Sequence, residues 1–184
     1  MRKPSTSDTE ILTLIRNRQT SRYGFSLLVQ QYQKQLYWHI RRMIVDHEDT
    51  NDLVQEVFVK IWKGIADFRE DSSLYTWIYR IATNECLSFL QKRQLRTMLP
   101  LLDTHRNRAE SLADDPYFTG DEIQAKLQAA LMKLPPKQRL VFNMRYYEEM
   151  PYDEMAAILK TSAGALKASY HIAAKKIEDS LRQD

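Results

Sequence analysis

Aromatic and cationic side chains alternate in the middle of the chain. Their order along the sequence is Trp62, Lys63, Phe68, Arg69, Tyr75, Trp77, Tyr79 and Arg80. Aromatic faces stack on unpaired bases while cationic groups hold the phosphate backbone, so this pattern is typical of proteins that bind single-stranded DNA. Core packing is the alternative, and it is favoured for Trp62 and Trp77, which fall on apolar helical stripes. Phe68, Tyr75 and Tyr79 surround a polar run that cannot continue a buried helix, so we expect these three to be partly exposed.

A second pattern, near the C-terminus, predicts two helices joined by a tight turn. Tyr152–Leu159 has the apolar spacing of a short helix, and Lys160-Thr161-Ser162 supplies a polar turn with capping residues. Ile158 and Leu166 are placed to pack between the two helices, which makes a helix-turn-helix unit. Such units also serve as plain structural elements, but the pattern favours DNA binding. The second helix presents, in its N-terminal half, Lys167, Ala168, Ser169, His171 and Ile172.

The third pattern is an acidic face that also carries an amide. Asp52, Gln55 and Glu56 share one side of a predicted helix because they are three and four residues apart. An ordinary solvated surface and a docking surface for a basic partner are both open interpretations.

The elements that position these residues are predicted to be helices. Apolar residues recur in steps of three and four, and there is no β-hairpin dipeptide and no long two-residue alternation. Asp49 to Asp52 supply capping residues for the second helix, and Pro135-Pro136 ends the fourth. The predicted fold class is therefore all-α. The helices are expected over about residues 25–43, 53–65, 74–95, 123–134, 140–147, 152–159 and 163–181.

One long segment lacks any sustained apolar period. Residues 97–120 contain Pro100, Pro116 and several aspartates, and we interpret them as a flexible linker, because so long a loop is uncommon inside one compact domain. Two small helical domains are therefore expected, the C-terminal one containing the helix-turn-helix. The predicted segments are an N-terminal tail at 1–20, a first domain at 21–96, the linker at 97–120 and a second domain at 121–184.

Composition and charge exclude several classes of protein. Hydrophobic residues make up 43% of the 184 residues, which excludes a disordered chain. No apolar run approaches the ~20 residues of a membrane span, so no membrane insertion is expected. The net charge of +3 conceals net acidic blocks at 52–71 and 110–122 and a net basic block at 80–108. Basic blocks favour contact with a polyanion, and solvated helix faces are the alternative.

No group of residues points to catalysis, a metal ion or a cofactor, so we expect a protein that is not an enzyme. His47-Glu48 lacks the second histidine of a zinc-binding helix, and no glycine-rich phosphate loop or serine nucleophile elbow is present. The single cysteine, Cys86, excludes an intrachain disulfide and is expected to be a half-buried apolar residue. A polar start without a signal-peptide core predicts a cytoplasmic protein.

Taken in order, the motifs resemble those of bacterial RNA polymerase sigma factors of the extracytoplasmic-function (ECF) group. The motifs that resemble the second conserved region of these factors are Asp52–Trp62, Phe68-Arg69 and Tyr75–Asn84. The motifs that resemble the fourth region are Leu134–Arg139, Tyr152–Ala156 and Gly164–Lys167. The resemblance covers about residues 21–96 and 121–184, and the short spacer is similar to that of the ECF group.

The resemblance implies a function and its partners. It implies a factor that binds core RNA polymerase through the β′ and β subunits, directs it to specific promoters and helps to melt the −10 element. Promoter DNA and an anti-sigma factor are the other implied partners. Asp52, Gln55 and Glu56 match positions that dock on the coiled coil of the β′ subunit.

The resemblance also assigns DNA-binding positions. Phe68, the loop up to Tyr75, and Asn84 match a pocket for a flipped base of the −10 element, and Trp77 matches a tryptophan beside the melted strand. The full set implied for the −10 element is Phe68, Arg69, Ser72, Ser73, Tyr75, Trp77, Arg80, Asn84, Gln91, Lys92 and Arg93. The set implied for the −35 element is Arg145, Lys167, Ala168, Ser169, His171 and Ile172.

The chain departs from the family pattern in its last helix. Ser169, Ile172 and Ala174 stand where family members usually carry arginines, so a less basic −35 contact is implied. Pro151 replaces the usual serine or threonine before the short helix. The alternative function is a helix-turn-helix regulator that binds duplex DNA without polymerase, which would not need the acidic face at Asp52.

Overall fold

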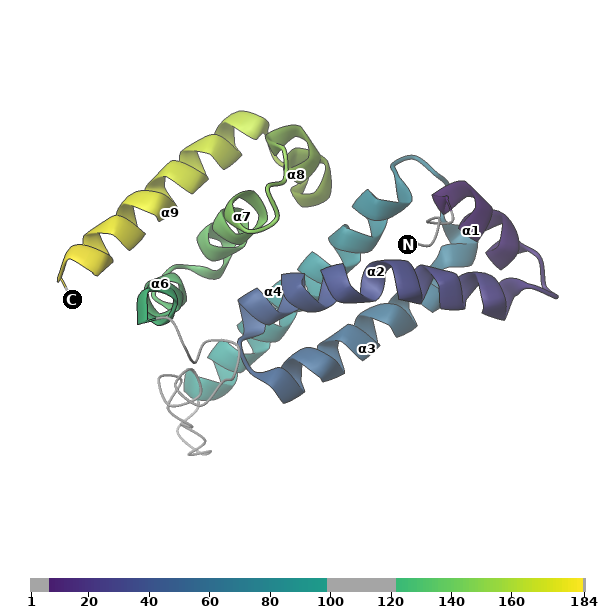
Figure 1. Ribbon diagram of the computed structural model, residues 1–184, viewed down its shortest axis with the longest axis horizontal. Helices are drawn as coiled ribbons and strands as arrows, with labels where there is room; N and C mark the ends of the chain where they lie inside the picture. The colour runs from purple at the N-terminus through teal and green to yellow at the C-terminus, as the bar shows by residue number, and fades with distance from the viewer. Residues whose placement is uncertain (1–6, 99–121, 184) are drawn as a thin grey trace.

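The computed structural model describes residues 7–98 and 122–183, which form two groups of helices with no β-strand among them (Figure 1). The N-terminal domain consists of α1 (Asp8–Arg16), α2 (Ser21–Ile44), α3 (His47–Gly64), the short 3-10 helix η1 (Ile65–Asp67) and α4 (Leu74–Met98). The C-terminal domain consists of α6 (Glu122–Met132), α7 (Pro136–Tyr146), α8 (Tyr152–Leu159) and α9 (Ala163–Gln183). The predicted all-α class is confirmed. The predicted linker lies outside the described residues, except for 97–98 at the end of α4.

Helix α1 is an element that the sequence analysis missed. Ser7 and Glu10 form a capping box, in which each side chain accepts a hydrogen bond from the other residue's backbone N–H. The helix packs on α2, and Gly24 allows the close approach, because a Cβ there would lie 2.8 Å from the backbone nitrogen of Ile15. The tail predicted for residues 1–20 is therefore wrong for residues 8–16.

The core of the N-terminal domain lies between α2, α3 and α4. It is built from aliphatic side chains that are completely buried, including Leu28, Leu36, Ile40, Val57, Ile61 and Ile78. Helix α3 starts earlier than predicted, because the Asp46 carboxylate accepts a hydrogen bond from the backbone N–H of Asp49 at 2.9 Å. The predicted capping segment, Asp49 to Asp52, therefore lies inside the helix.

The C-terminal domain contains the predicted helix-turn-helix. Helix α8 has the predicted bounds, and it ends at Lys160, which adopts the left-handed conformation with φ of 52°. Ser162 then accepts a hydrogen bond from the backbone N–H of Ala165 at 3.2 Å, which stabilises the start of α9. Ile158 and Leu166 are 2% and 3% exposed, so the predicted packing between α8 and α9 is confirmed.

The two domains are in contact. Helices α2 and α4 of the N-terminal domain pack against α7 and α8 of the C-terminal domain (Figure 1). The main apolar core continues across this contact, from residues such as Ile40 and Ala82 to Met144, Met155 and Ile158. In the part of the chain that the structure describes, no helix is long and apolar enough to span a membrane.

Candidate functional site

The acidic face predicted on α3 is exposed. Asp52, Gln55 and Glu56 all point away from the core, while Leu53 and Val57 on the opposite side of the helix are buried. An α-helix repeats every 3.6 residues, so the same face continues along α3 toward its C-terminal end. There it carries large apolar side chains that are partly exposed, namely Val59 (50%) and Trp62 (40%).

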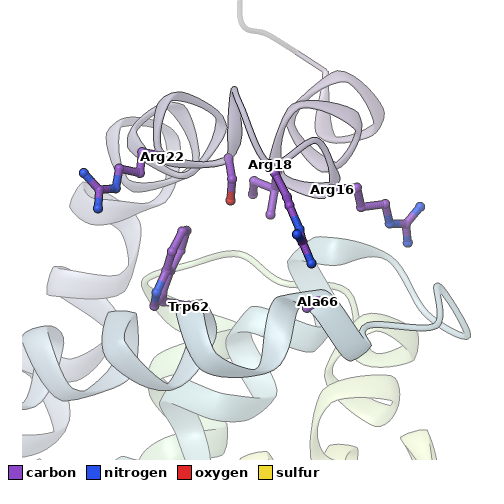
Figure 2. A pocket seen from close by; sticks show the side chains of 7 residues that line it. Arg16, Arg18, Arg22, Trp62 and Ala66 are labelled. Atoms are coloured by element: carbon purple, nitrogen blue, oxygen red, sulfur yellow. The ribbon is translucent and has the colours of Figure 1, made fainter.

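Trp62 lies between two neighbouring hollows. One hollow, of about 470 Å³, is lined by Arg22, Phe25, Phe58, Val59 and Trp62. The other, of about 450 Å³, has Trp62 and Ala66 on one side, and on the other side arginines from α1, from α2 and from the turn between them (Figure 2). Its lining residues are Ile15, Arg16, Arg18, Ser21, Arg22, Trp62 and Ala66.

The prediction that Trp62 is a core residue is wrong. Its ring contacts Phe25 edge-on, with centroids 4.8 Å apart, but 40% of the residue is exposed to solvent. The sequence contained a signal for this, because Trp62 follows Gln55 by seven residues and therefore lies on the same helical face. We name the surface formed by Asp52, Gln55, Glu56, Val59 and Trp62 the α3 surface.

The loop between η1 and α4 is anchored by a buried aromatic side chain. Phe68 is 6% exposed, and its ring centroid lies 5.1 Å from that of Trp77. Arg16 of α1 donates a hydrogen bond to the Phe68 carbonyl at 3.3 Å and forms an ion pair with Glu70 at 2.7 Å. The expectation that Phe68 is partly exposed is wrong, because η1 turns its side chain under α4 and not toward solvent.

Tyr75 and Tyr79 differ in their exposure. Their rings stack with centroids 4.2 Å apart, and Tyr79 also contacts the ring of His39 at 5.1 Å. Tyr79 is only 3% exposed, so the expectation of partial exposure is wrong for it, whereas Tyr75 is half-buried as predicted. Burial raises the pKa of Tyr75 to about 12, so its hydroxyl keeps its proton even above pH 10, where an exposed tyrosine ionises.

One polar residue of this loop stabilises the fold, and two others remain at least partly exposed to solvent. Ser73 caps α4, because its hydroxyl accepts a hydrogen bond from the backbone N–H of Thr76 at 3.1 Å. Arg69 is exposed and Ser72 is half-buried. The half-buried Trp77 packs between Phe68 and Gly64, where an added Cβ would lie 3.3 Å from the indole.

The predicted DNA-binding side chains of α4 extend along most of the helix. Asn84, Gln91 and Lys92 are exposed, and Arg93 forms an ion pair with Asp49 of α3 at 3.4 Å. Arg80 is different, because its Nη2 donates a hydrogen bond of 2.7 Å to the carbonyl oxygen of Ala157 in α8. The N-terminal half of α4 is therefore in contact with the helix-turn-helix.

The second helix of the helix-turn-helix presents its predicted residues outward. Lys167, Ala168, His171 and Ile172 are exposed and Ser169 is half-buried, with Ile172 46% exposed. Two cations lie over the ring of Tyr152, with Lys167 Nζ at 5.7 Å and the Arg145 guanidinium at 5.2 Å from its centroid.

Arg145 stabilises the loop before α8. Its Nη1 donates hydrogen bonds to the carbonyl oxygens of Glu149 and Met150 at 3.3 and 3.2 Å. These bonds fix the position of its guanidinium beside Tyr152, the first residue of α8 and of the helix-turn-helix.

The described residues contain no group of three or more His, Cys, Asp or Glu side chains that could hold a metal ion. Cys86 is completely buried, not half-buried as expected, because α4 packs it into the domain core. Burial raises the pKa of its thiol, which therefore stays protonated and unreactive at neutral pH.

Comparison with known proteins decides the family. The chain is 29% identical over 169 residues to the RNA polymerase sigma-H factor of Pseudomonas aeruginosa, with 86% of each chain covered. It is 27% identical to the ECF RNA polymerase sigma-E factor of Escherichia coli, covering 86% of this chain and 87% of that one. Residues 28–96 match the family described as Sigma-70 region 2, and residues 124–177 match the one described as Sigma-70, region 4. The chain is an ECF sigma factor.

Two solved structures share the fold of this chain. The ECF sigma factor described here superposes with a TM-score of 0.69 on CnrH in complex with the cytosolic domain of CnrY, at 23% identity, covering 96% of this chain and 98% of CnrH. It superposes with a TM-score of 0.68 on the sigma factor RpoE in complex with the anti-sigma factor NepR from Bartonella quintana, at 23% identity, covering 87% and 98% of the two chains.

Family membership settles the general function. As a sigma factor, the protein binds core RNA polymerase, directs it to specific promoters and initiates transcription, and it is not an enzyme. The alternative of a helix-turn-helix regulator without polymerase is excluded, because the chain contains both conserved sigma regions. In this ECF sigma factor helix α3, which carries the α3 surface, lies on the side of the N-terminal domain away from the C-terminal domain (Figure 1).

Proposed function

We propose that the α3 surface is the site at which this sigma factor binds the coiled coil of the polymerase β′ subunit. The observation that carries the proposal is the continuous exposed face, which begins with Asp52, Gln55 and Glu56 and ends with Val59 and Trp62. Charged groups steer the encounter of two proteins, whereas a partly buried aromatic residue supplies most of the binding energy. The hollows beside Trp62 give an apolar side chain of the partner a place to insert.

The proposed −10 site consists of the loop before α4 and the exposed face of α4. Arg69, Ser72, Ser73, Tyr75 and Trp77 would surround a flipped base, with Asn84 as a hydrogen-bonding group. Arg80, Gln91, Lys92 and Arg93 would contact the backbone and the adjacent duplex. Because Phe68 is buried beneath Trp77, we assign it the role of positioning the loop.

The proposed −35 site is the outward face of α9. Lys167, Ala168, Ser169, His171 and Ile172 are all in the N-terminal half of this helix, which is the part of a helix-turn-helix that enters the major groove. Lys167 supplies the only full positive charge among these five, and Arg145 adds a second cation beside Tyr152. Few charged side chains are therefore available for direct contacts with the bases. Apolar contact of Ile172 with a thymine methyl group is favoured instead.

We infer that residues 21–96 and 121–184 act as separate promoter-binding units joined by residues 97–120. We also infer a cytoplasmic location and an anti-sigma factor as a partner. Two observations support these inferences. The first is that the relatives are RNA polymerase sigma factors, which act where polymerase and promoter DNA are found. The second is that the sigma factor RpoE of Bartonella quintana, which has the same fold, was solved in complex with the anti-sigma factor NepR.

Run-off transcription with core RNA polymerase on a random promoter library tests the proposed function. The full-length protein should select templates that share two short elements, and a protein with Gln55→Ala and Glu56→Ala should select none. Lys34→Ala is the matched control, because this exposed residue of α2 lies outside every proposed site. Equal transcription by the double variant and the wild type would contradict the assignment of the α3 surface.

A further inference from the structure

The last residue of α1 contacts the loop that precedes α4. Nη2 of Arg16 donates a hydrogen bond to the carbonyl oxygen of Phe68, 52 residues away in the sequence, at 3.3 Å. The same nitrogen lies 2.7 Å from Oε1 of Glu70. Figure 2 shows that the Arg16 side chain extends away from Trp62, so it is turned out of the hollow that it borders. Arg16 therefore connects α1 to the start of the loop.

Helix α1 is a fixed support for this contact. The Asp8 carboxylate at its start accepts hydrogen bonds from the Tyr32 hydroxyl at 2.8 Å and from the Gln31 amide at 2.9 Å. After its end, the Thr20 hydroxyl donates a hydrogen bond of 2.8 Å to the carbonyl oxygen of Leu14. Because both ends of α1 are bonded to α2 or to its N-cap, the last turn of α1 has a defined position in the N-terminal domain.

The start of α1 also supports the proposed −10 site. Tyr32 is 3% exposed, and its ring centroid lies 6.4 Å from that of Tyr75. Asp8, which accepts a hydrogen bond from the Tyr32 hydroxyl, therefore supports Tyr75 through a buried side chain. One helix is thus connected to the −10 site at two places, to the loop through Arg16 and to Tyr75 through Tyr32.

The loop contains a turn that needs support. Glu70 has a φ of 60°, in the left-handed region that residues with a side chain rarely adopt. Such a conformation persists when surrounding contacts hold it in place. Arg16 contacts this turn at two points, Phe68 and Glu70. The next anchor is Ser73, which caps α4, so residues 69–72 lie between two fixed points.

The ion pair contributes little to the stability of the fold. The side chains of Arg16 and Glu70 are 48% and 49% exposed, and the attraction between charges at such exposure is screened by solvent. A loop that is already held in its bound conformation, however, binds its ligand with a smaller loss of conformational freedom. The contact therefore acts on the position of the loop.

We propose that Arg16 is a positioning residue of the −10 site, which holds the loop at Glu70 in the conformation that accepts a flipped base. The inference rests on the proposed function of this loop and of α4. Arg16 acts through Phe68 and Glu70 and does not itself contact DNA. Promoter melting by this sigma factor then depends on α1, a helix that lies outside both sets of predicted DNA-binding residues.

Permanganate footprinting of the −10 element tests this role on a promoter selected by run-off transcription. Holoenzyme is formed with full-length protein at saturating core polymerase, because Arg16 also borders the hollow beside Trp62. We expect Arg16→Ala to lower the fraction of open complexes about fivefold, and Arg16→Lys, which keeps the charge, to lower it by less. Lys34→Ala is the matched control. It removes one positive charge from an exposed position of α2 outside the proposed sites, so melting should be unchanged.

A double-mutant cycle measures whether Arg16 acts through Glu70. In protein that carries Glu70→Ala, the loss caused by Arg16→Ala should fall from about fivefold to about twofold or less, because the ion pair is already absent. The cycle also cancels the direct effect of each charge on DNA, since that effect is present in both backgrounds. A fivefold loss in both backgrounds overturns the proposal.

Salt dependence and stability separate positioning from other roles. Arg16→Ala should leave the slope of log K against log salt unchanged for holoenzyme and promoter DNA, whereas loss of a direct phosphate contact lowers it by about one. The midpoint of urea denaturation should also stay at the wild-type value. A lower slope, or a loss of melting that a lower midpoint explains, overturns the positioning role.

The outcomes separate this role from the proposed function itself. Normal melting with Arg16→Ala overturns the role of Arg16 and leaves the assignment of the −10 site unchanged. Wild-type holoenzyme that leaves the −10 element unmelted contradicts the proposed function, and the positioning role is then overturned with it.

Discussion

Arg80 of α4 and Ala157 of α8 are 77 residues apart in sequence, and the guanidinium of the first donates a 2.7 Å hydrogen bond to the carbonyl oxygen of the second. The same guanidinium is proposed to contact the −10 element. If Arg80 donates to DNA through this same Nη2, its hydrogen bond to Ala157 has to break first. The proposed role of Arg80 in −10 recognition therefore predicts a change in the contact between α4 and α8 when promoter DNA binds.

Trp62→Ala should weaken the affinity for core polymerase about tenfold, because it removes the aromatic part of the α3 surface. The indole is 40% exposed, so the loss of folding stability should be small. Binding to immobilised core polymerase measures the affinity, with Lys34→Ala as the control. Unchanged affinity would limit the polymerase contact to the acidic end of α3.

Asn84→Ala should reduce the fraction of open complexes without reducing the binding of duplex promoter DNA. The side chain is exposed on α4, and its amide is proposed to hold a flipped base. Permanganate footprinting of the −10 element measures melting. Gln94→Ala, another exposed amide of the same helix, is the control, and normal melting in Asn84→Ala would contradict the assigned role.

Lys167→Ala should weaken promoter binding and lower the slope of log K against log salt by about one, because one phosphate contact releases about one counterion. Lys175→Ala also removes one positive charge, from a position about two turns further along α9, and it should leave the slope unchanged. Titrations of holoenzyme with promoter DNA at several salt concentrations provide both slopes. Equal slopes for wild type and Lys167→Ala would show that Lys167 does not contact phosphate.

Gly24→Ala should destabilise the protein by about 1–3 kcal/mol, because an added methyl group would overpack the contact between α1 and α2. Its Cβ would lie 2.8 Å from the backbone nitrogen of Ile15, which cannot move as a flexible side chain does. Gly164→Ala has no atom within 4 Å of the added Cβ and should be neutral or stabilising by up to about 1 kcal/mol. Urea denaturation compares the two variants, and equal midpoints would argue against a tight α1–α2 contact.

Cys86 should not react with iodoacetamide at pH 8 in the folded protein, and it should react rapidly in urea. Burial raises the pKa of this thiol above its ordinary value of 9.0, so the folded state keeps the proton that the unfolded state loses. The contribution of Cys86 to stability is therefore complete below about pH 9 and decreases as the pH rises further. Mass spectrometry of the alkylated protein measures the reactivity of Cys86 with iodoacetamide. Denaturation midpoints between pH 7 and 10 measure the loss of stability as the pH rises.

The helices and the helix-turn-helix could be predicted because their signals are local. The turn chemistry of Lys160 to Ser162 fixes the end of α8 and the start of α9, and the burial of Ile158 and Leu166 follows from helical spacing. Helix α1 was missed although its capping box, Ser7 to Glu10, can be read in the sequence, because only nine residues follow the cap.

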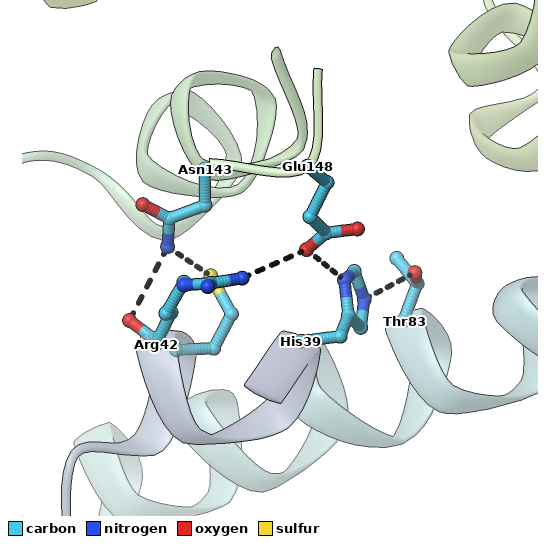
Figure 3. A network of polar contacts seen from close by, with 6 residues as sticks. His39, Arg42, Thr83, Asn143 and Glu148 are labelled. Atoms are coloured by element: carbon cyan, nitrogen blue, oxygen red, sulfur yellow. Dashed lines mark hydrogen bonds and ion pairs between the residues drawn. The ribbon is translucent and has the colours of Figure 1, made fainter. Parts of the chain in front are cut away.

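Exposure at the proposed −10 site was harder to predict than helix position. Phe68 and Tyr79 are buried because of the way η1, α2 and α4 stack, which no local pattern of aromatic residues contains. The contact between His39 and Glu148 (Figure 3) was missed for a related reason. His39 and Glu148 are 109 residues apart, and neither has a neighbour in the sequence that indicates their pairing.

Helix α3 lies on the side of the N-terminal domain that the C-terminal domain leaves uncovered. A protein that docks on the proposed α3 surface therefore needs no prior movement of the C-terminal domain. Its rate of association with this sigma factor should then be insensitive to substitutions at the contact between the two domains.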